Sequence, residues 1–154
     1  MESTACERDM PGILISQQIA AEVRNMAKRR VTGGSGAGTS KGKIKICNIE
    51  KGLPTVGQAH KRIEEEIAAA KFGKWSCMKL IHGYGSSGKG GMIKNSLPSF
   101  LDAQMRRGNI RDYIRGEDFS IFDSCTQRAL LRYPDLSEDP DLEKCNHGIT
   151  IILL

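Results

Sequence analysis

Apolar and polar residues follow strand-like or helix-like spacing along most of the chain. Lysine and apolar side chains alternate at 43–47, which predicts a strand. An apolar stripe at helical spacing follows, so we expect a helix that begins at the capping box of Thr55 and Gln58 and ends at Gly73. The apolar run at 77–81 is typical of a short buried strand.

Strands and helices continue to alternate in the remaining sequence. A second apolar stripe runs from Met92 to Met105, with Pro98 as an expected kink and Gly108 as the stop. The later predicted elements are a third strand within 109–115, a helix at 121–132, a loop rich in proline and aspartate at 133–141, and a final strand at 148–154. This alternation predicts an α/β layer structure with a mixed or parallel sheet.

The N-terminal part of the chain has a different composition. Apolar residues at mostly helical intervals predict a helix at 13–30, and the glycine-rich stretch at 32–40 is typical of a flexible linker. We therefore divide the chain into 1–42, a helix with a Gly/Ser-rich linker, and 43–154, the folded domain. The N-terminal helix also offers an amphipathic stripe to a protein partner or to the domain itself.

Length and composition exclude several classes of protein. The 154 residues, of which 39% are hydrophobic and 27% charged, suit one globular domain with a tail. No apolar run approaches the roughly 18 residues of a membrane-spanning helix, and the N-terminus lacks signal-peptide features, so we expect a cytoplasmic protein without a membrane partner.

The five cysteines and three histidines lack paired metal-binding spacing. No cofactor is predicted, and a divalent metal stays an alternative.

Charge is unevenly distributed along the domain. Residues 43–116 hold fourteen basic and six acidic side chains, whereas 117–154 hold three basic and eight acidic ones. Because Lys and Arg neutralise phosphates and release counterions, the basic half favours a nucleic acid or a nucleotide as partner. Aromatic residues make up only 5% of the chain, which favours duplex or structured nucleic acid over stacked single strands. The alternative is a solvated basic surface without a partner.

A glycine-rich loop follows the predicted strand at 77–81. Residues 83–88 fit G-x-G-x-x-G and 83–89 fit G-x-x-x-x-G-K, two nucleotide-binding patterns. Gly90 stands where the second pattern needs Ser or Thr, and Asp102 falls within a helical stripe, so a nucleotide-binding or cofactor-binding protein is a distant alternative. The loop still suits an anion, because glycine amides and the start of a helix bind phosphate.

The same loop carries a family resemblance. The stretch Leu80–Gly85, which contains His82-Gly83-Tyr84-Gly85, resembles the H-G-x-G core of the Smr (small MutS-related) domain. Residues 55–59 resemble the opening of that family's first helix and 148–153 its closing strand, so the resemblance covers about 43–154. It implies a two-layer α/β sandwich with a mixed four-stranded sheet, and a nucleic-acid-binding domain that acts as an endonuclease, nicking DNA or cleaving RNA. A non-catalytic nucleic-acid-binding module is the alternative.

Candidate site residues follow from this loop. His82 is the expected proton donor or acceptor, and the alternative is a structural histidine that hydrogen-bonds the loop. Smr domains commonly carry D-L-H-G after the first strand, which this chain lacks; in the matching stretch Glu50 can serve as a base, whereas Asn48 can only hydrogen-bond. The expected phosphate-binding residues are Gly83, Gly85, Gly88, Lys89, Gly90 and Gly91, and the expected nucleic-acid contacts are Tyr84 and Lys94.

An acidic insertion at about 117–147 separates the third strand from the last one. It is longer than the connection usual in Smr domains. Because negative charge repels nucleic acid, we expect the insertion to lie away from the loop or to gate the substrate.

Overall fold

The computed structural model describes residues 44–84 and 89–154. The predicted helix at 13–30, its linker, and Gly85 and Gly88 of the loop lie outside the described residues. Lys89 and Gly90 are described only as the backbone that begins a helix.

Four strands form one mixed sheet, as expected. The strands are β1 (Ile44–Asn48), β2 (Cys77–Ile81), β3 (Asp112–Arg115) and β4 (Ile149–Leu153), in the spatial order β1-β2-β4-β3. β1 runs parallel to β2, whereas β4 is antiparallel to both of its neighbours. The register pairs Asn48 with Ile81, and Ile81 with Ile149. The carboxyl ends of β1 and β2 therefore lie beside the amino end of β4.

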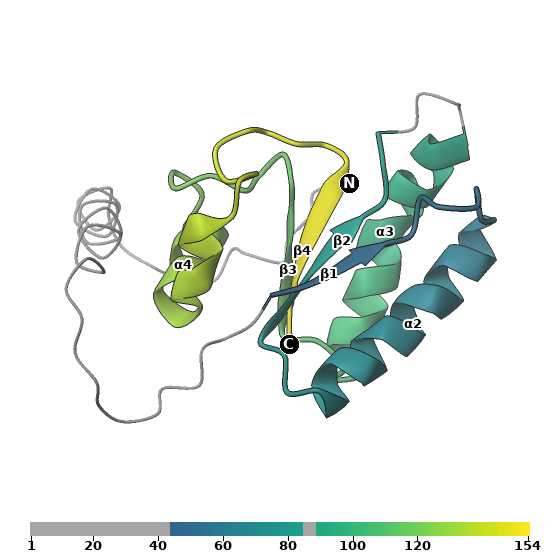
Figure 1. Ribbon diagram of the computed structural model, residues 1–154, viewed down its shortest axis with the longest axis horizontal. Helices are drawn as coiled ribbons and strands as arrows, with labels where there is room; N and C mark the ends of the chain where they lie inside the picture. Colours follow the sequence, from purple (N-terminus) through teal and green to yellow (C-terminus); the bar gives the residue numbers. More distant parts are fainter. Residues whose placement is uncertain (1–43, 85–88) are drawn as a thin grey trace.

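Two long helices, α2 (Val56–Phe72) and α3 (Lys89–Arg106), cover one face of the sheet (Figure 1). The predicted capping box begins α2, because the Thr55 hydroxyl accepts a hydrogen bond from the Gln58 amide and the Gln58 side chain accepts one from the Thr55 amide. Gly73 caps the other end, as expected. Both ends of α2 were therefore predicted correctly from neighbouring residues in the sequence.

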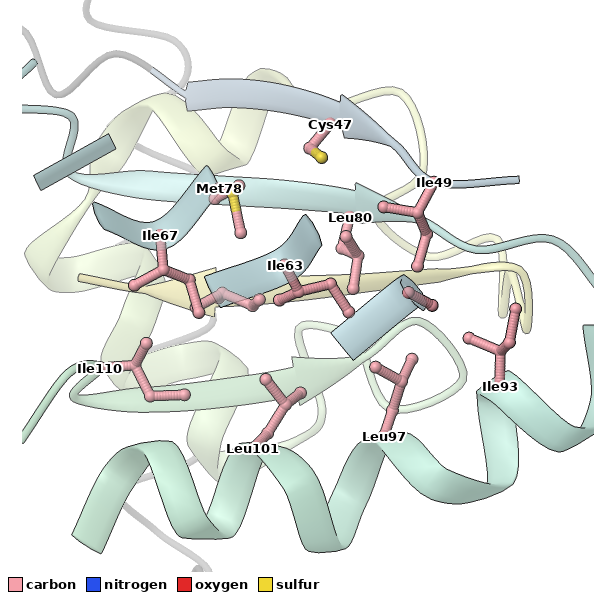
Figure 2. Close-up of a cluster of buried hydrophobic side chains, with 12 residues drawn as sticks. Cys47, Ile49, Ile63, Ile67, Met78, Leu80, Ile93, Leu97, Leu101 and Ile110 are labelled. Carbon is pink, nitrogen blue, oxygen red and sulfur yellow. The ribbon is translucent and has the colours of Figure 1, made fainter. Parts of the chain in front are cut away.

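A buried apolar cluster fixes α3 against the sheet. Figure 2 shows Ile93, Leu97 and Leu101 of α3 pointing toward the strands, where Met78 and Leu80 of β2 lie. All five side chains are at most 5% exposed, so the cluster contributes hydrophobic stabilisation to both elements. The first turn of α3 is held near the end of β2 as a result.

The acidic insertion adds a third layer that the expected two-layer sandwich does not have. α4 (Ser124–Arg132) lies on the opposite side of the sheet from α2 and α3 (Figure 1), and the 3-10 helix η2 (Pro134–Glu138) follows it. Ala129, Leu130 and Leu136 join a second buried cluster with β3 and β4. The insertion is not a solvated segment, because its apolar stripe finds a complementary sheet face.

A buried ion cluster ties this third layer to the sheet. Lys79, near the middle of β2, contacts Asp139 Oδ1 at 2.7 Å and also Asp141. The side chains of Lys79 and Asp139 are each only 6% exposed. Asp139 and Asp141 of the insertion therefore lie on the face of the sheet opposite α3.

Element boundaries differ from the prediction in three places. α4 begins at Ser124 because the Asp123 side chain caps it by accepting from the Thr126 amide. The predicted loop at 133–141 contains η2. β3 begins at Asp112, after a left-handed turn at Gly108 (φ 71°) ends the α3 segment. Among the described residues, no helix has the length and apolarity needed to cross a membrane.

Candidate functional site

Three segments meet at one edge of the sheet. Residues 48–50 follow β1, residues 82–84 follow β2, and residues 146–148 precede β4. The amides of His82 and Gly83 both donate to the Gly148 carbonyl, at 3.0 and 3.1 Å. Residues 48–50 and 82–84 lie together because β1 and β2 are parallel, so their carboxyl ends are neighbours. Residues 146–148 join them because β4 is antiparallel to β2 and begins at that end.

His82 lies inside the protein rather than at its surface. His82 is only 2% exposed. Its Nδ1 lies 3.0 Å from the Gly83 carbonyl oxygen, and its Nε2 lies 3.1 Å from the Thr150 hydroxyl. A carbonyl can only accept, so Nδ1 donates and Nε2 accepts from Thr150. Burial lowers the pKa of His82 below its usual range, because it disfavours the charged imidazolium. This arrangement favours a histidine that holds the loop.

Asn48 and Glu50 both reach the loop region from β1. The Asn48 side-chain oxygen accepts from the Glu50 amide at 2.9 Å, so its amide group shapes the turn after β1. Glu50 is exposed, and its carboxylate lies against Gly83: a Cβ on Gly83 would sit 2.7 Å from Oε1. Gly83 also has a φ of 76°, which favours glycine. Glu50 therefore faces the loop backbone, while the partners of the His82 ring are Gly83 and Thr150.

The remaining predicted contacts lie on both sides of the loop. Tyr84 is 69% exposed, and Lys94 is half-buried on the second turn of α3. Gly91, in the first turn of α3, has no atom within 4 Å of the position of a Cβ. Among the described residues, the space beside Gly91 is therefore open.

Lys94 belongs to a charged cluster that the sequence pattern does not reveal. Glu117 Oε2 lies 3.0 Å from Lys94 Nζ and 2.8 Å from His147 Nδ1, and Glu117 Oε1 lies 3.3 Å from Arg115. These groups come from α3, from the end of β3 and from the turn before β4. Glu117 and His147 are 30 residues apart, so only the β3–β4 pairing brings them together.

The cluster borders a cavity of about 270 Å³ between α3 and the sheet. Its polar lining includes His82, Lys94, Asn95, Arg115, Glu117, His147 and Thr150, and apolar side chains such as Leu97 and Leu101 line the rest. At the rim, the Tyr84 ring meets the His147 ring edge-on at 5.5 Å, and Lys94 Nζ lies 5.7 Å from the Tyr84 ring centre. His82 therefore forms part of the cavity wall, while His147 is the more accessible imidazole.

Glu117 keeps its negative charge in this setting. Partial burial pushes the pKa of Glu117 up, but hydrogen bonds from Lys94 and His147 outweigh burial and lower that pKa below its usual range. Arg115 also pairs with Asp118, at 2.7 Å, so the carboxylates of Glu117 and Asp118 stand against the two cations Lys94 and Arg115, beside one imidazole. The formal charges of these four side chains cancel, and the side chains of Lys94 and Arg115 are 28% and 45% exposed beside the cavity.

Within 44–84 and 89–154, no group of three or more His, Cys, Asp or Glu side chains is arranged to hold a metal ion. The expectation of no cofactor and the alternative of a divalent metal stay predictions.

Comparison with known proteins returns no match: no family model, no curated protein and no solved structure is similar to this chain.

Proposed function

We propose that this chain is a nucleic-acid-binding module of the Smr type that binds the phosphate backbone at the cavity between α3 and the sheet. The observation that supports the proposal best is the convergence of Lys94, Arg115 and His147 on that cavity, with Tyr84 exposed at its rim. Cationic side chains that converge on one opening are groups that bind phosphate in proteins.

The charge distribution agrees with a polyanion as the partner. The basic half of the domain, 43–116, carries the strand end, the loop and α3, whereas the acidic insertion covers the opposite face through Asp139 and Asp141. Among the described residues, Glu117 is the acidic side chain of the insertion that lines the cavity, where it bonds Lys94 and His147. Such a surface attracts a polyanion and directs it toward the α3 side.

In this proposal His82 is a positioning residue. Its two ring hydrogen bonds join the Gly83 carbonyl to Thr150 of β4, which fixes the backbone where the loop leaves the sheet. The amides of His82 and Gly83 are held in the same place, because both donate to the Gly148 carbonyl.

Salt-dependent binding tests the proposal. We expect the full chain to bind a short DNA or RNA duplex with an affinity that falls as salt rises, and Lys94→Ala to reduce the log–log salt slope by about 1. Lys71→Ala is the matched control, because Lys71 lies at the far end of α2. Equal slopes for the two variants, or no measurable binding, would contradict the proposal.

A second candidate function is endonuclease activity, and the His147–Glu117 pair favours it. Glu117 holds Nδ1 of His147 at 2.8 Å, which leaves Nε2 free of that bond and able to take a proton from an attacking hydroxyl or water. Labelled RNA and nicked-plasmid assays test it with His147→Ala and His82→Ala. Loss of cleavage in His147→Ala alone would assign the proton transfer to His147. Loss in both variants would keep His82 in the mechanism. No cleavage by the wild type would contradict the endonuclease function and leave nucleic-acid binding as the proposed function.

A further inference from the structure

The turn before β4 carries a thiol beside the imidazole of the charged cluster. Cys145 Sγ lies 3.7 Å from Nε2 of His147, and Nδ1 of the same ring lies 2.8 Å from the Glu117 carboxylate. A carboxylate only accepts, so Nδ1 carries the hydrogen and Nε2 presents its lone pair to the thiol. Nucleophile, base and orienting carboxylate therefore stand in the order that activates a thiol.

Lys94 completes this order rather than disturbing it. Its Nζ lies 3.0 Å from Glu117 Oε2 and 3.2 Å from His147 Nδ1. Because Nδ1 already carries a hydrogen, the ammonium donates to Glu117. The carboxylate is thereby fixed from two sides, and it holds the ring in one orientation.

The backbone around Cys145 is locked on both sides. Cys145 has a φ of 51°, in the left-handed region that a side chain rarely adopts. Before it, the Lys144 amide donates to the Asp141 carbonyl; after it, the Asn146 side chain donates to Asp141 and accepts from the Gly148 amide. A strained residue that its surroundings hold in place is typical of functional positions.

Exposure separates Cys145 from the other thiols that the structure describes as free. Cys145 is exposed, whereas Cys47 and Cys77 are buried in the two apolar clusters. Burial raises the pKa of the Cys47 thiol, and it raises that of Cys77 to about 12. Cys47 and Cys77 are therefore inert references within the same molecule.

We propose that Cys145 is a reactive thiol, with His147 as its general base and Glu117 as the positioning residue, and that it takes up small disulfides as a mixed disulfide. The Cys145 proton passes to His147 Nε2, and the thiolate attacks one sulfur of the disulfide. A new S–S bond forms to Cys145 as the old one breaks, and the departing thiolate receives the proton from the imidazolium. Cys145 is oxidised and the departing sulfur is reduced. This activity goes beyond the proposed function and requires no nucleic acid.

The proposal is tested by treating the folded full chain with oxidised glutathione, then digesting it and locating the modified cysteines by mass spectrometry. We expect Cys145 to be modified about tenfold faster, or more, than Cys47 and Cys77, and His147→Ala to slow Cys145 by about tenfold or more, since general-base assistance is commonly worth 10² or more. Free imidazole should restore much of the lost rate, which a merely structural effect would not allow. His60→Gln is the matched control, because that ring bonds Ser96 and stacks on Phe100.

Two results would overturn the proposal. One is a Cys145 rate that His147→Ala leaves unchanged while Cys47 and Cys77 stay protected. The other, which holds even if His147→Ala does not fold, is a Cys145 rate in folded wild type no greater than that of the same thiol in urea-unfolded chain. Either failure leaves the duplex-binding result untouched, because no step of this assay contains nucleic acid.

Discussion

Two lysines on opposite faces of the sheet make similar ion clusters with different surroundings. Lys79 faces α4 and η2 and bonds Asp139 and Asp141, with its side chain 6% exposed. Lys94 faces the cavity beside the loop and bonds Glu117 and His147, with its side chain 28% exposed. The sealed cluster holds two layers together, whereas the half-open one keeps its charged groups partly accessible to solvent. Surroundings, more than residue type, separate structure from function here.

The largest expected effect breaks the sealed cluster. Lys79→Met keeps the stem of the side chain but leaves two carboxylates beside the sheet without their cation, so we expect a loss of about 3–5 kcal/mol in the free energy of unfolding. Urea denaturation measures it. Combining Lys79→Met with Asp139→Asn and Asp141→Asn should recover part of the loss, and a loss below about 1 kcal/mol for Lys79→Met alone would show that the cluster is not sealed.

The loop beside the open cluster gives the next effect. Gly83→Ala places a Cβ at a φ of 76° and 2.7 Å from Glu50 Oε1, so we expect a cost of about 1–2 kcal/mol, measured by thermal or urea unfolding. Adding Glu50→Ala to Gly83→Ala removes the contact with the new Cβ but not the backbone strain, so only part of the lost stability should return. Gly91→Ala is the control: it meets open space, and its stability should stay equal or rise slightly. Equal stability of Gly83→Ala and wild type would contradict this conformation of the turn.

A smaller effect depends on pH. The folded-state pKa of His82 is lowered by burial, so below its unfolded pKa of about 6.5 the unfolded chain binds a proton that the folded chain does not. Wild-type stability should therefore decline as pH falls through that value. His82→Gln should flatten the decline; His60, whose pKa burial also lowers, contributes equally to both proteins. Parallel pH profiles for the two proteins would mean that the imidazole is not buried.

The smallest effect on stability is expected at the open cluster itself. Lys94→Met removes a cation whose partners are partly solvated, so the free energy of unfolding should change by no more than about 1 kcal/mol in urea denaturation. The free energy of unfolding should therefore fall much less for Lys94→Met than for Lys79→Met. A loss as large as that of Lys79→Met would make Lys94 a structural residue.

Local patterns predicted the regular elements well. The capping box at Thr55 and the apolar run of β2 depend on neighbouring residues only, and both are confirmed. The family resemblance suggested that Asn48 or Glu50 faces the loop, and the Glu50 carboxylate lies against Gly83. Whether these residues and the loop bind or cleave nucleic acid stays a prediction.

The sequence did not reveal the cavity cluster, for a physical reason. Lys94 and His147 are 53 residues apart, and only the antiparallel placement of β4 between β2 and β3 brings them together. The burial of His82 was equally hidden, because it depends on Thr150 of β4. A cue for Cys145 existed in its two-residue spacing from His147, but spacing alone does not distinguish a contact from coincidence.

The central claim is that a polyanion binds at the open cluster and not at the sealed one. Titration of the isotope-labelled chain with a short nucleic-acid duplex, followed by NMR of backbone amides, tests it most directly. We expect salt-sensitive shifts at Tyr84, Gly91, Lys94 and Gly148, with the signals around Lys79 and Asp139 unmoved. Shifts confined to the α4 face, or none at low salt, would contradict the account.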